Sequence, residues 1–299
     1  MTIAVVTGGA GFIGSHVADL LVARGWDVIV LDDLSTGDRS NVSAQARFVE
    51  GSVTDLTLLR EIFAGADYVF HLAALARIQP SFDDPVGHEE VNVVGTIRCL
   101  EAARDAARLR KVVVSASSAC YGTPDLVPTP ETAAIRCLSP YALQKYAAEQ
   151  HALILGERYG VPVVALRYFN VYGPRSFSPR NPYNAYTSVV GIFANQKLAG
   201  TPLTITGDGE QQRDLVHAQD VAAANLAAAL GEPSGTVYNV GGGRTITINA
   251  LAALFDHPHT FVAQRRGEAR VTWACIDRIR AELGWAPAID LRRGLENAC

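Results

Sequence analysis

The sequence predicts an α/β protein built on a Rossmann-type, doubly wound parallel sheet with a smaller C-terminal lobe for a substrate. Three observations support this. A β-branched run over 3–6 leads through a glycine-rich turn into apolar residues at helical spacing. Short apolar strands then alternate with helical segments, which is typical of βαβ units and a parallel sheet. After Pro174 the composition shifts toward turn-forming and polar residues, as expected of a substrate loop.

The strands expected in this sheet are short and rich in β-branched residues. They cover 3–6, 26–31, 46–51, 68–72, 111–115 and 161–166, and 237–240 is expected to return to the sheet. Helices are predicted over 56–63 and 89–108 and, in the second half, over 188–199, 220–230 and 249–255. A further strand is predicted over 203–206. Ligands of such sheets bind beyond the carboxyl ends of the strands.

The glycines after the first strand have the spacing G-x-x-G-x-x-G, at Gly8, Gly11 and Gly14. Glycine lets the backbone turn sharply and approach a ligand, and the following helix offers free N–H groups to an anion. The turn therefore predicts a diphosphate site. By itself the spacing also fits an ordinary strand–helix turn, because it departs from the G-x-G-x-x-G fingerprint.

The second strand supplies the context, since it ends in Asp32 and Asp33. A carboxylate at this position binds a ribose diol and repels a 2′-phosphate, so NAD is favoured over NADP. The alternative role for Asp32 is a helix or turn cap. We therefore divide the chain into a NAD-binding domain over 1–172, with later segments returning to it, and a lobe over 173–299 that mainly binds the substrate, a sugar nucleotide by the resemblance given below.

A helix beginning after Ser139 carries Tyr141 and Lys145, four residues apart and on one face. A lysine ammonium beside a phenol is expected to lower the tyrosine pKa, so that Tyr141 can take a proton from an alcohol. Ser117 lies in a hydroxyl-rich segment after the fifth strand and is placed to bind the same oxygen. The alternative is a surface aromatic residue beside a solvated lysine.

The whole-chain composition excludes several classes of function. The chain has 299 residues, 48% of them hydrophobic, and a formal net charge of −4, which argues against nucleic-acid binding. No apolar run has the length of a membrane span, and the first ten residues already form a strand, so we expect no signal peptide. The five cysteines have no C-x-x-C or metal-ligand spacing, which predicts reduced thiols, no metal and a cytoplasmic location.

Several further motifs give the sequence a family resemblance. They are TGGAGFIG at 7–14, LDDLSTG at 31–37, HLAA at 71–74, EVNVVGT at 90–96, LRYFNVYGPR at 166–175 and GDGEQQRD at 207–214. Together with Ser117, Tyr141 and Lys145 they cover most of the chain in family order. The sequence resembles the extended short-chain dehydrogenases/reductases of the NAD-dependent epimerase/dehydratase family.

The resemblance implies a set of cofactor-binding and substrate-binding residues. The expected cofactor-binding residues are Gly8, Gly11, Phe12, Ile13, Gly14, Asp32, Asp33, Ser35, Thr36, Gly37, Ser52, Val53, Leu72, Ala73, Ala74, Asn92, Ser115, Tyr141, Lys145 and Tyr168. The nucleoside diphosphate of the substrate is expected to contact Asn170, Arg213, Arg265 and Glu268. Three positions depart from the family pattern: Ser52 replaces an aspartate, and in the segment 265–268 Arg266 replaces the usual proline and Glu268 the usual aspartate.

The resemblance also implies chemistry at the C4 hydroxyl of a UDP-sugar, with Tyr141 as base, Ser117 binding the oxygen and Lys145 tuning the phenol. The resulting 4-keto sugar is either reduced from its other face or dehydrated. The usual 4,6-dehydratases have an Asp-Glu pair where this chain has Ser118 and Ala119. We therefore predict 4-epimerisation of a UDP-hexose or UDP-N-acetylhexosamine.

Cys120 leaves an alternative open, because the family commonly has an aliphatic residue at this place. It is either a small buried hydrophobe or the acid of an atypical dehydratase that yields a 5,6-ene. A second alternative is a NAD-binding sensor without catalysis.

Three expectations concern residues away from the chemistry. His71 is predicted to be a satisfied core histidine. Asn92 is expected either to tie two loops together or to hold the cofactor loop. The helices over 89–108 and 141–159 have alanine- and leucine-rich outer faces, which the family often pairs in a homodimer.

Overall fold

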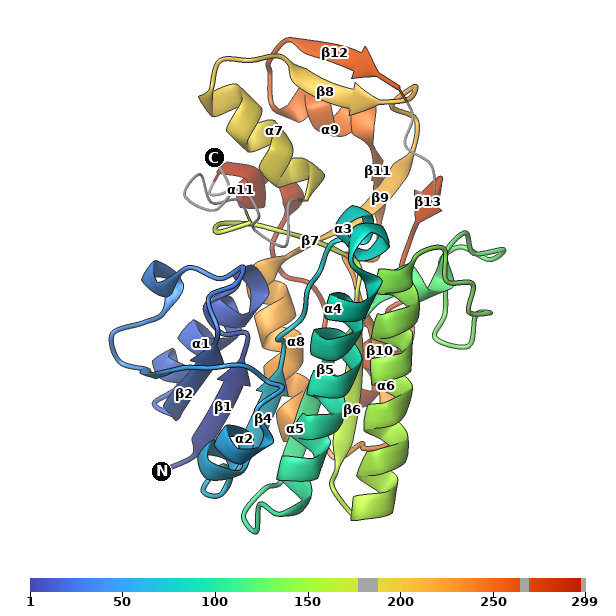
Figure 1. Ribbon diagram of the computed structural model, residues 1–299. Helices are drawn as coiled ribbons and strands as arrows, with labels where there is room; N and C mark the ends of the chain where they lie inside the picture. Colours follow the sequence, from blue (N-terminus) through green and yellow to red (C-terminus); the bar gives the residue numbers. More distant parts are fainter. Residues whose placement is uncertain (177–187, 264–268, 297–299) are drawn as a thin grey trace.

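A parallel sheet of seven strands forms the centre of the larger lobe in the computed structural model, which describes residues 1–176, 188–263 and 269–296 (Figure 1). The strand order is β10-β6-β5-β4-β1-β2-β3. All of these strands are parallel, but the chain adds β2 and β3 on one side of β1 and the later strands on the other, so the order of addition reverses between β1 and β4. This order confirms the predicted Rossmann-type sheet and the return of 237–240 to it. The strands are β1 Ile3–Thr7, β2 Asp27–Asp32, β3 Arg47–Glu50, β4 Tyr68–His71, β5 Lys111–Ser117, β6 Val163–Tyr168 and β10 Thr236–Val240.

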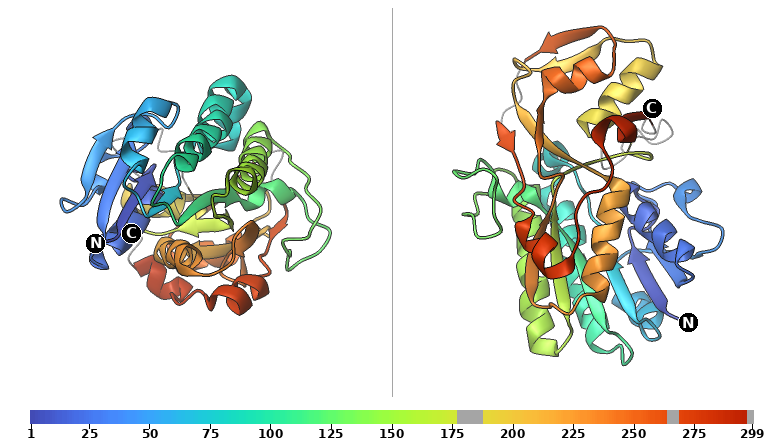
Figure 2. Two further views of the ribbon diagram at one scale, coloured as in Figure 1. Left: turned by 90° about the horizontal axis from the view of Figure 1, so that it is seen from below. Right: turned by 180° about the vertical axis from the view of Figure 1, so that it is seen from behind.

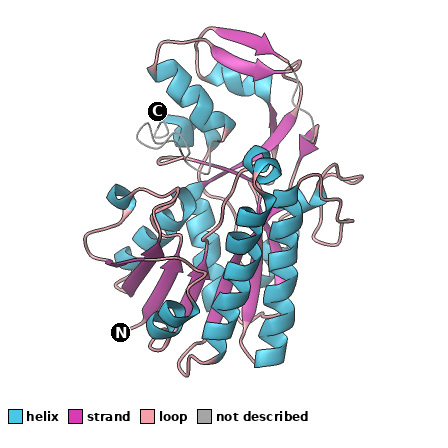
Figure 3. Ribbon diagram, in the orientation of Figure 1, coloured by secondary structure: helices cyan, strands magenta, loops and turns pink. Residues whose placement is uncertain are grey.

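Helices cover both faces of this sheet (Figures 2 and 3). The helices α1 (Phe12–Ala23) and α8 (Ala218–Leu230) pack together on one face, and α2 (Leu56–Phe63), α5 (Gly95–Arg104) and α6 (Pro140–Tyr159) cover the other. Side chains alternate between the faces of a strand, so Ala4 and Val6 join the core under α1, whereas Val5 joins the core under α5. Burial on both faces explains why these strands are almost uniformly apolar.

The smaller lobe lies beyond the carboxyl ends of the large sheet (Figure 1). Its central strand pairs with three others: β9 Gln212–His217 lies beside β7 Asn170–Tyr172, β11 Thr245–Thr247 and β13 Val271–Thr272. A separate pair, β8 Leu203–Thr206 and β12 His259–Val262, packs with the helices α7 (Val189–Leu198) and α9 (Ile248–Leu254). The chain ends in α10 (Asp277–Leu283) and α11 (Leu291–Glu296). Because β10 and α8 belong to the large lobe, the chain after residue 172 contributes to both lobes.

The predicted helix over 89–108 is wrong in its continuity and its end. The structure has α4 (Pro85–Glu89), a π-helical turn η2 (Glu90–Val94) and then α5, which ends at Arg104. The Oδ1 atom of Asn92 accepts a hydrogen bond from the Leu75 N–H at 2.8 Å, and the Thr96 hydroxyl donates to the Asn92 carbonyl at 2.8 Å. Such π turns are frequent at functional sites, and this one turns Asn92 toward the loop after β4.

The remaining short helices connect the larger elements. They are η1 (Arg39–Asn41), α3 (Ile78–Asp83) and η3 (Ser118–Tyr121). Among the described residues, none of the helices combines the length and apolar character needed to cross a membrane.

Candidate active site

The glycine turn brings β1, the end of β4 and the start of α1 into close contact. Gly8 has φ +69°, and a Cβ there would lie 2.6 Å from the Ala73 backbone nitrogen. A Cβ on Gly14 would meet the Gly8 carbonyl oxygen, so α1 packs directly on the turn. Gly11 caps α1 without a side chain, which leaves the first N–H groups of the helix available to an anion.

Asp32, the last residue of β2, lies beside the glycine turn. Its two carboxylate oxygens accept hydrogen bonds from the Ala10 and Leu34 N–H groups, both at 2.9 Å. Burial raises its pKa, and these N–H groups oppose that shift. Asp32 therefore acts as a turn cap, the alternative role, and it also faces the pocket with a fixed carboxylate.

One pocket at the carboxyl ends of the strands is lined by most of the predicted cofactor residues and by Ser117. The predicted residues that line it are Gly8, Gly11, Phe12, Ile13, Gly14, Asp32, Asp33, Ser35, Thr36, Val53, Leu72, Ala73, Ala74, Ser115, Tyr141, Lys145 and Tyr168. The sequence missed other lining residues, namely Leu31, Gly51, Leu75, Ala76, Val91 and Ala116. These are small or apolar, so only their proximity to the motif residues in the chain signals a role.

Three predicted cofactor residues, Gly37, Ser52 and Asn92, are not among the residues that line the pocket. Gly37 packs against Asp32, where a Cβ would come within 2.9 Å of Oδ1. The Ser52 hydroxyl bonds with Thr54 Oγ1 at 2.9 Å. Asn92 holds the lining loop, because Nδ2 also donates to the Leu75 carbonyl at 3.1 Å. Of the two roles expected for Asn92, holding the cofactor loop fits these two hydrogen bonds to Leu75.

Helix α6 presents Tyr141 and Lys145 to the pocket. Ser139 caps the helix as predicted, since its hydroxyl accepts from the Ala142 N–H at 3.2 Å. The Ser81 hydroxyl on α3 accepts a second hydrogen bond, from the Tyr141 N–H at 3.1 Å. Lys145 donates to the Ser115 hydroxyl at 3.3 Å. These contacts fix the first turn of α6 against α3 and the end of β5.

The electrostatics of the pair correct one expectation. Burial raises the pKa of Tyr141, and a hydrogen bond with Ser117 only partly offsets it. Burial also lowers the pKa of Lys145 to about 8. The predicted lowering of the tyrosine pKa by the ammonium is therefore wrong for the protein alone, because desolvation of the phenolate is the larger effect.

Cys120 does not line the pocket. It is 1% exposed within the hydrophobic core, and burial raises its pKa to about 12. The Cys120 carbonyl oxygen accepts a hydrogen bond from the Cys137 thiol at 3.8 Å. A thiol of this kind behaves as a small hydrophobe, so this geometry gives no support to Cys120 as an acid.

Asn170 and Arg213 lie on neighbouring strands of the smaller lobe and outside the lining of this pocket. Asn170 Nδ2 donates to the Asp214 carbonyl at 2.9 Å and to Thr272 Oγ1 at 2.8 Å. Arg213 donates to the Gln212 and Ala269 carbonyls at 3.0 and 2.9 Å. The other two predicted substrate residues, Arg265 and Glu268, lie outside the described residues.

His71 is the satisfied core histidine that the sequence predicts. Its Nδ1 lies 2.8 Å from Thr7 Oγ1, and its Nε2 lies 2.9 Å from Thr96 Oγ1. Burial lowers its pKa to about 3, so the ring is neutral in the folded protein.

The fold and the site define a class: a Rossmann-type protein with a dinucleotide pocket and a Ser-Tyr-Lys set beside it. The family model described as "NAD dependent epimerase/dehydratase family" matches residues 4–241. The chain belongs to this family, and the predicted cofactor agrees with the family's description.

Individual relatives are similar over nearly their whole length. The UDP-glucose 4-epimerase of Mycolicibacterium smegmatis is 38% identical over 306 residues, covering 97% of this chain and 95% of the relative. The Thermotoga maritima UDP-glucose 4-epimerase, solved with UDP-glucose, has a TM-score of 0.93 and 37% identity, covering 100% and 97% of the two chains. The Thermus thermophilus UDP-glucose 4-epimerase, solved with NAD, has a TM-score of 0.88 and 35% identity, covering 100% and 97%.

Proposed function

We propose that this protein is a NAD-dependent nucleotide-sugar 4-epimerase acting on a UDP-hexose or a UDP-N-acetylhexosamine. One observation carries the proposal: Ser117, Tyr141 and Lys145 line the same pocket as the glycine turn between β1 and α1. The family match and the UDP-glucose 4-epimerases among the relatives support it.

The residues present fit NAD as the cofactor. The N–H groups at the start of α1 would bind the diphosphate, and the Asp32 carboxylate, which the Ala10 N–H orients, would bind the adenosine ribose. Tyr168 would lie against the cofactor with its hydroxyl turned away, because that hydroxyl donates to Asn225 Oδ1 at 3.0 Å. When bound, NAD supplies a hydride acceptor beside the sugar C4.

The proton chemistry falls to three side chains. Tyr141 takes the proton from the C4 hydroxyl while Ser117 binds the same oxygen, and a positioned base of this kind contributes roughly 10²–10⁴-fold. Burial raises the pKa of Tyr141, and in this proposal the Lys145 ammonium offsets part of that cost by stabilising the phenolate. Turnover of the 4-keto sugar within the site presents its opposite face, so return of the hydride to C4 on that face and of the proton from Tyr141 to the C4 oxygen gives the 4-epimer.

We propose that the smaller lobe binds the nucleoside diphosphate through Asn170, Arg213, Arg265 and Glu268. Arginine forks match phosphate oxygens in geometry and charge, which is the physical basis of this assignment. The position of β7 and β9 beyond the carboxyl ends of the large sheet supports it, because a sugar nucleotide there would reach the pocket from above.

Dehydration is the weaker candidate. It requires an acid near C6, and the buried Cys120 thiol has a pKa of about 12. An epimerase keeps its activity in Cys120→Ala, whereas a dehydratase that uses this thiol loses it. A NAD-binding sensor would give no turnover with any nucleotide sugar.

The decisive experiment is incubation of the purified protein with UDP-glucose, UDP-N-acetylglucosamine and UDP-glucuronate. We expect unchanged product mass with a new NMR spin system for at least one substrate. Loss of one water would show dehydration instead. Tyr141→Phe should abolish the product, with Tyr159→Phe at the far end of α6 as the matched control; equal turnover in Tyr141→Phe would refute the mechanism.

We also propose a homodimer in the cytoplasm. Leu143 and Ile154 on α6 are 58% and 63% exposed, on a helix that packs beside α5. An apolar helical surface of this kind is suited to pairing with a second copy. The described cysteines, Cys99, Cys120, Cys137 and Cys275, are free thiols, which suits a reducing compartment. Sedimentation equilibrium of the parent and of Leu143→Glu/Ile154→Glu tests the dimer.

A further inference from the structure

A buried ion pair lies one helical turn after Lys145. Glu149 follows Lys145 by four residues on α6, so the two side chains leave the same face of the helix. Its carboxylate accepts hydrogen bonds from Arg167 Nε at 2.7 Å and from Nη2 at 2.6 Å. Glu149 is 1% and Arg167 4% exposed. One guanidinium therefore holds both carboxylate oxygens in a bidentate fork.

Arg167 belongs to the strand that borders the site. In the register between β5 and β6, Ala116 lies opposite Arg167, and Ser117 lies opposite Tyr168. Tyr168 faces α8, so the alternation along the strand turns Arg167 to the other face, toward α6. The ion pair thus connects the strand pair beside Ser117 to the helix that carries Tyr141 and Lys145.

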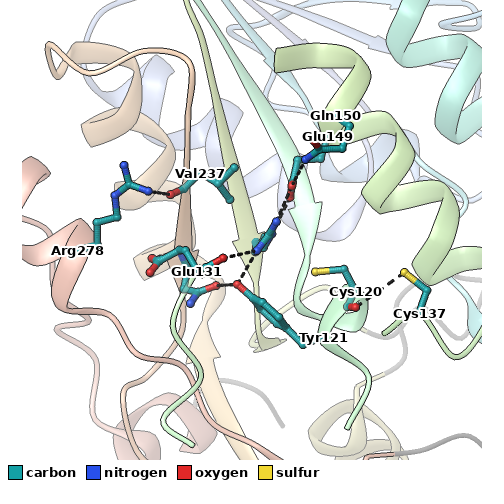
Figure 4. Close-up of polar contacts among 10 residues, drawn as sticks. Cys120, Tyr121, Glu131, Cys137, Glu149, Gln150, Val237 and Arg278 are labelled. Atoms are coloured by element: carbon teal, nitrogen blue, oxygen red, sulfur yellow. Dashed lines mark hydrogen bonds and ion pairs between the residues drawn. The ribbon is translucent and has the colours of Figure 1, made fainter. Parts of the chain in front are cut away.

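A network of polar groups fixes the guanidinium (Figure 4). Arg167 Nη1 donates to Tyr121 Oη at 2.8 Å, and the Tyr121 hydroxyl donates to Asn239 Oδ1 at 2.8 Å. The Asn239 N–H donates to Glu131 Oε1 at 2.8 Å. Because these partners come from β10, η3 and the loop before α6, the position of Arg167 is determined from three sides.

The fork changes what Glu149 can do to Lys145. A free carboxylate four residues from an ammonium on the same helix can pair with it directly. Instead, Arg167 occupies both Glu149 oxygens, and the hydrogen bond given by the Lys145 ammonium goes to Ser115 at 3.3 Å. Among the described residues, Glu149 pairs with Arg167 and not with Lys145.

We propose that Glu149 and Arg167 form a positioning pair for Lys145, in which Arg167 fixes the Glu149 carboxylate so that it stabilises the ammonium charge without binding it. The proposal deepens the function proposed above, because it rests on the role of Lys145 beside Tyr141. Neither residue touches substrate or cofactor in this proposal, so both act through Lys145.

The charges around Lys145 are consistent with this role. Burial lowers the pKa of Lys145 to about 8, and Glu149 opposes that shift. The other groups that face it are Tyr141 on the same helix, Ser115 on β5 and the neutral His71 on β4. Among the described residues, Glu149 is the anion that opposes the effect of burial on the Lys145 pKa.

The direct test is titration of the lysine itself in the NAD-bound protein. The sequence contains three lysines, Lys111, Lys145 and Lys197, so NMR of labelled lysine side chains resolves them, and Lys145→Met assigns the signal. In Glu149→Gln, which keeps the shape and removes the charge, we expect the Lys145 midpoint to fall by about one pKa unit. An unchanged midpoint overturns the proposal, whether or not the protein turns over a sugar.

Two further variants separate charge from structure. Glu149→Asp retains the anion and should keep the parent midpoint, even if its stability falls. Gln150→Ala removes the amide that donates to Glu149 Oε1 at 3.0 Å but leaves the carboxylate, so its midpoint should also stay. If Glu149→Gln does not fold, Glu149→Gln/Arg167→Met replaces the pair without an unpaired buried charge. Its midpoint should also be lower than that of the parent, by less than in Glu149→Gln because a positive charge is removed as well.

The activity profile gives the second readout. The alkaline limb of kcat/KM should move to lower pH by about the same unit in Glu149→Gln, so that activity above the limb falls about tenfold. Lowering the pH should restore it, which a merely structural defect would not do. An inactive parent would refute the proposed function alone, whereas an active parent with an unmoved limb in Glu149→Gln would refute the positioning pair alone.

Discussion

The Ser81 hydroxyl accepts a hydrogen bond from the backbone N–H of Tyr141 at 3.1 Å. Ser81 is fully buried on α3, and it also donates to the Ile78 carbonyl, so its orientation is fixed. The N–H groups in the first turn of a helix have no partner within the helix. The N-cap Ser139 accepts from the Ala142 N–H and not from the Tyr141 N–H. Ser81, on another element, supplies the acceptor for Tyr141, and it therefore couples the segment after β4 to the candidate base.

Ser81→Ala should lower both stability and kcat. Loss of the acceptor leaves the Tyr141 N–H buried without a partner, at a cost of about 1–3 kcal/mol in unfolding free energy. We expect kcat to fall about tenfold through misplacement of the phenol, since small displacements are costly in catalysis. Steady-state kinetics and urea unfolding measure the two effects. Ser81→Thr keeps the hydroxyl as control, and parental kinetics in Ser81→Ala would contradict the coupling.

Gly14→Ala should impair NAD binding. The added Cβ would meet the Gly8 carbonyl oxygen and push α1 away from the turn that is proposed to bind the diphosphate. We expect NAD to bind at least about tenfold more weakly, which corresponds to about 1.4 kcal/mol. Gly65→Ala is the matched control, because a Cβ at Gly65 meets nothing within 4 Å. Fluorescence titration with NAD measures both, and equal affinity in the two variants would argue against a diphosphate at this turn.

Because burial lowers the pKa of His71, the free energy of unfolding should decrease as the pH falls below 6.5. The folded pKa of His71 is about 3, against 6.5 for an unperturbed histidine, so below pH 6.5 the unfolded chain binds a proton that the folded protein does not. The stabilisation is complete above pH 6.5 and is lost as the pH falls toward 3. This one group contributes a slope of about 1.4 kcal/mol per pH unit in that window.

His71→Gln should remove this slope. Its unfolding midpoint in urea, measured at fixed NAD and protein concentration from pH 7 to 5, should change less with pH than that of the parent. The exposed His151→Gln is the control and should retain the parental slope. Parallel curves for the parent and His71→Gln would show that His71 does not titrate in this way.

The sequence by itself determined the large sheet and most of the pocket. Its information is local: β-branched runs, the spacing of Gly8, Gly11 and Gly14, and the four-residue step from Tyr141 to Lys145 follow from strand and helix geometry. The rule that parallel strands present their carboxyl ends at one edge then placed Asp32 and Ser117 near the same ligand.

The tertiary structure decided everything that depends on burial and on contacts distant in the chain. It interrupted the helix expected over 89–108, because Asn92 bonds to Leu75, and it put the Cys120 thiol in the core. It also reversed the expected pKa shift of Tyr141, since desolvation is set by packing and not by spacing. The fork between Glu149 and Arg167 joins residues 18 positions apart. It depends on how β6 packs against α6, which no local pattern in the sequence specifies.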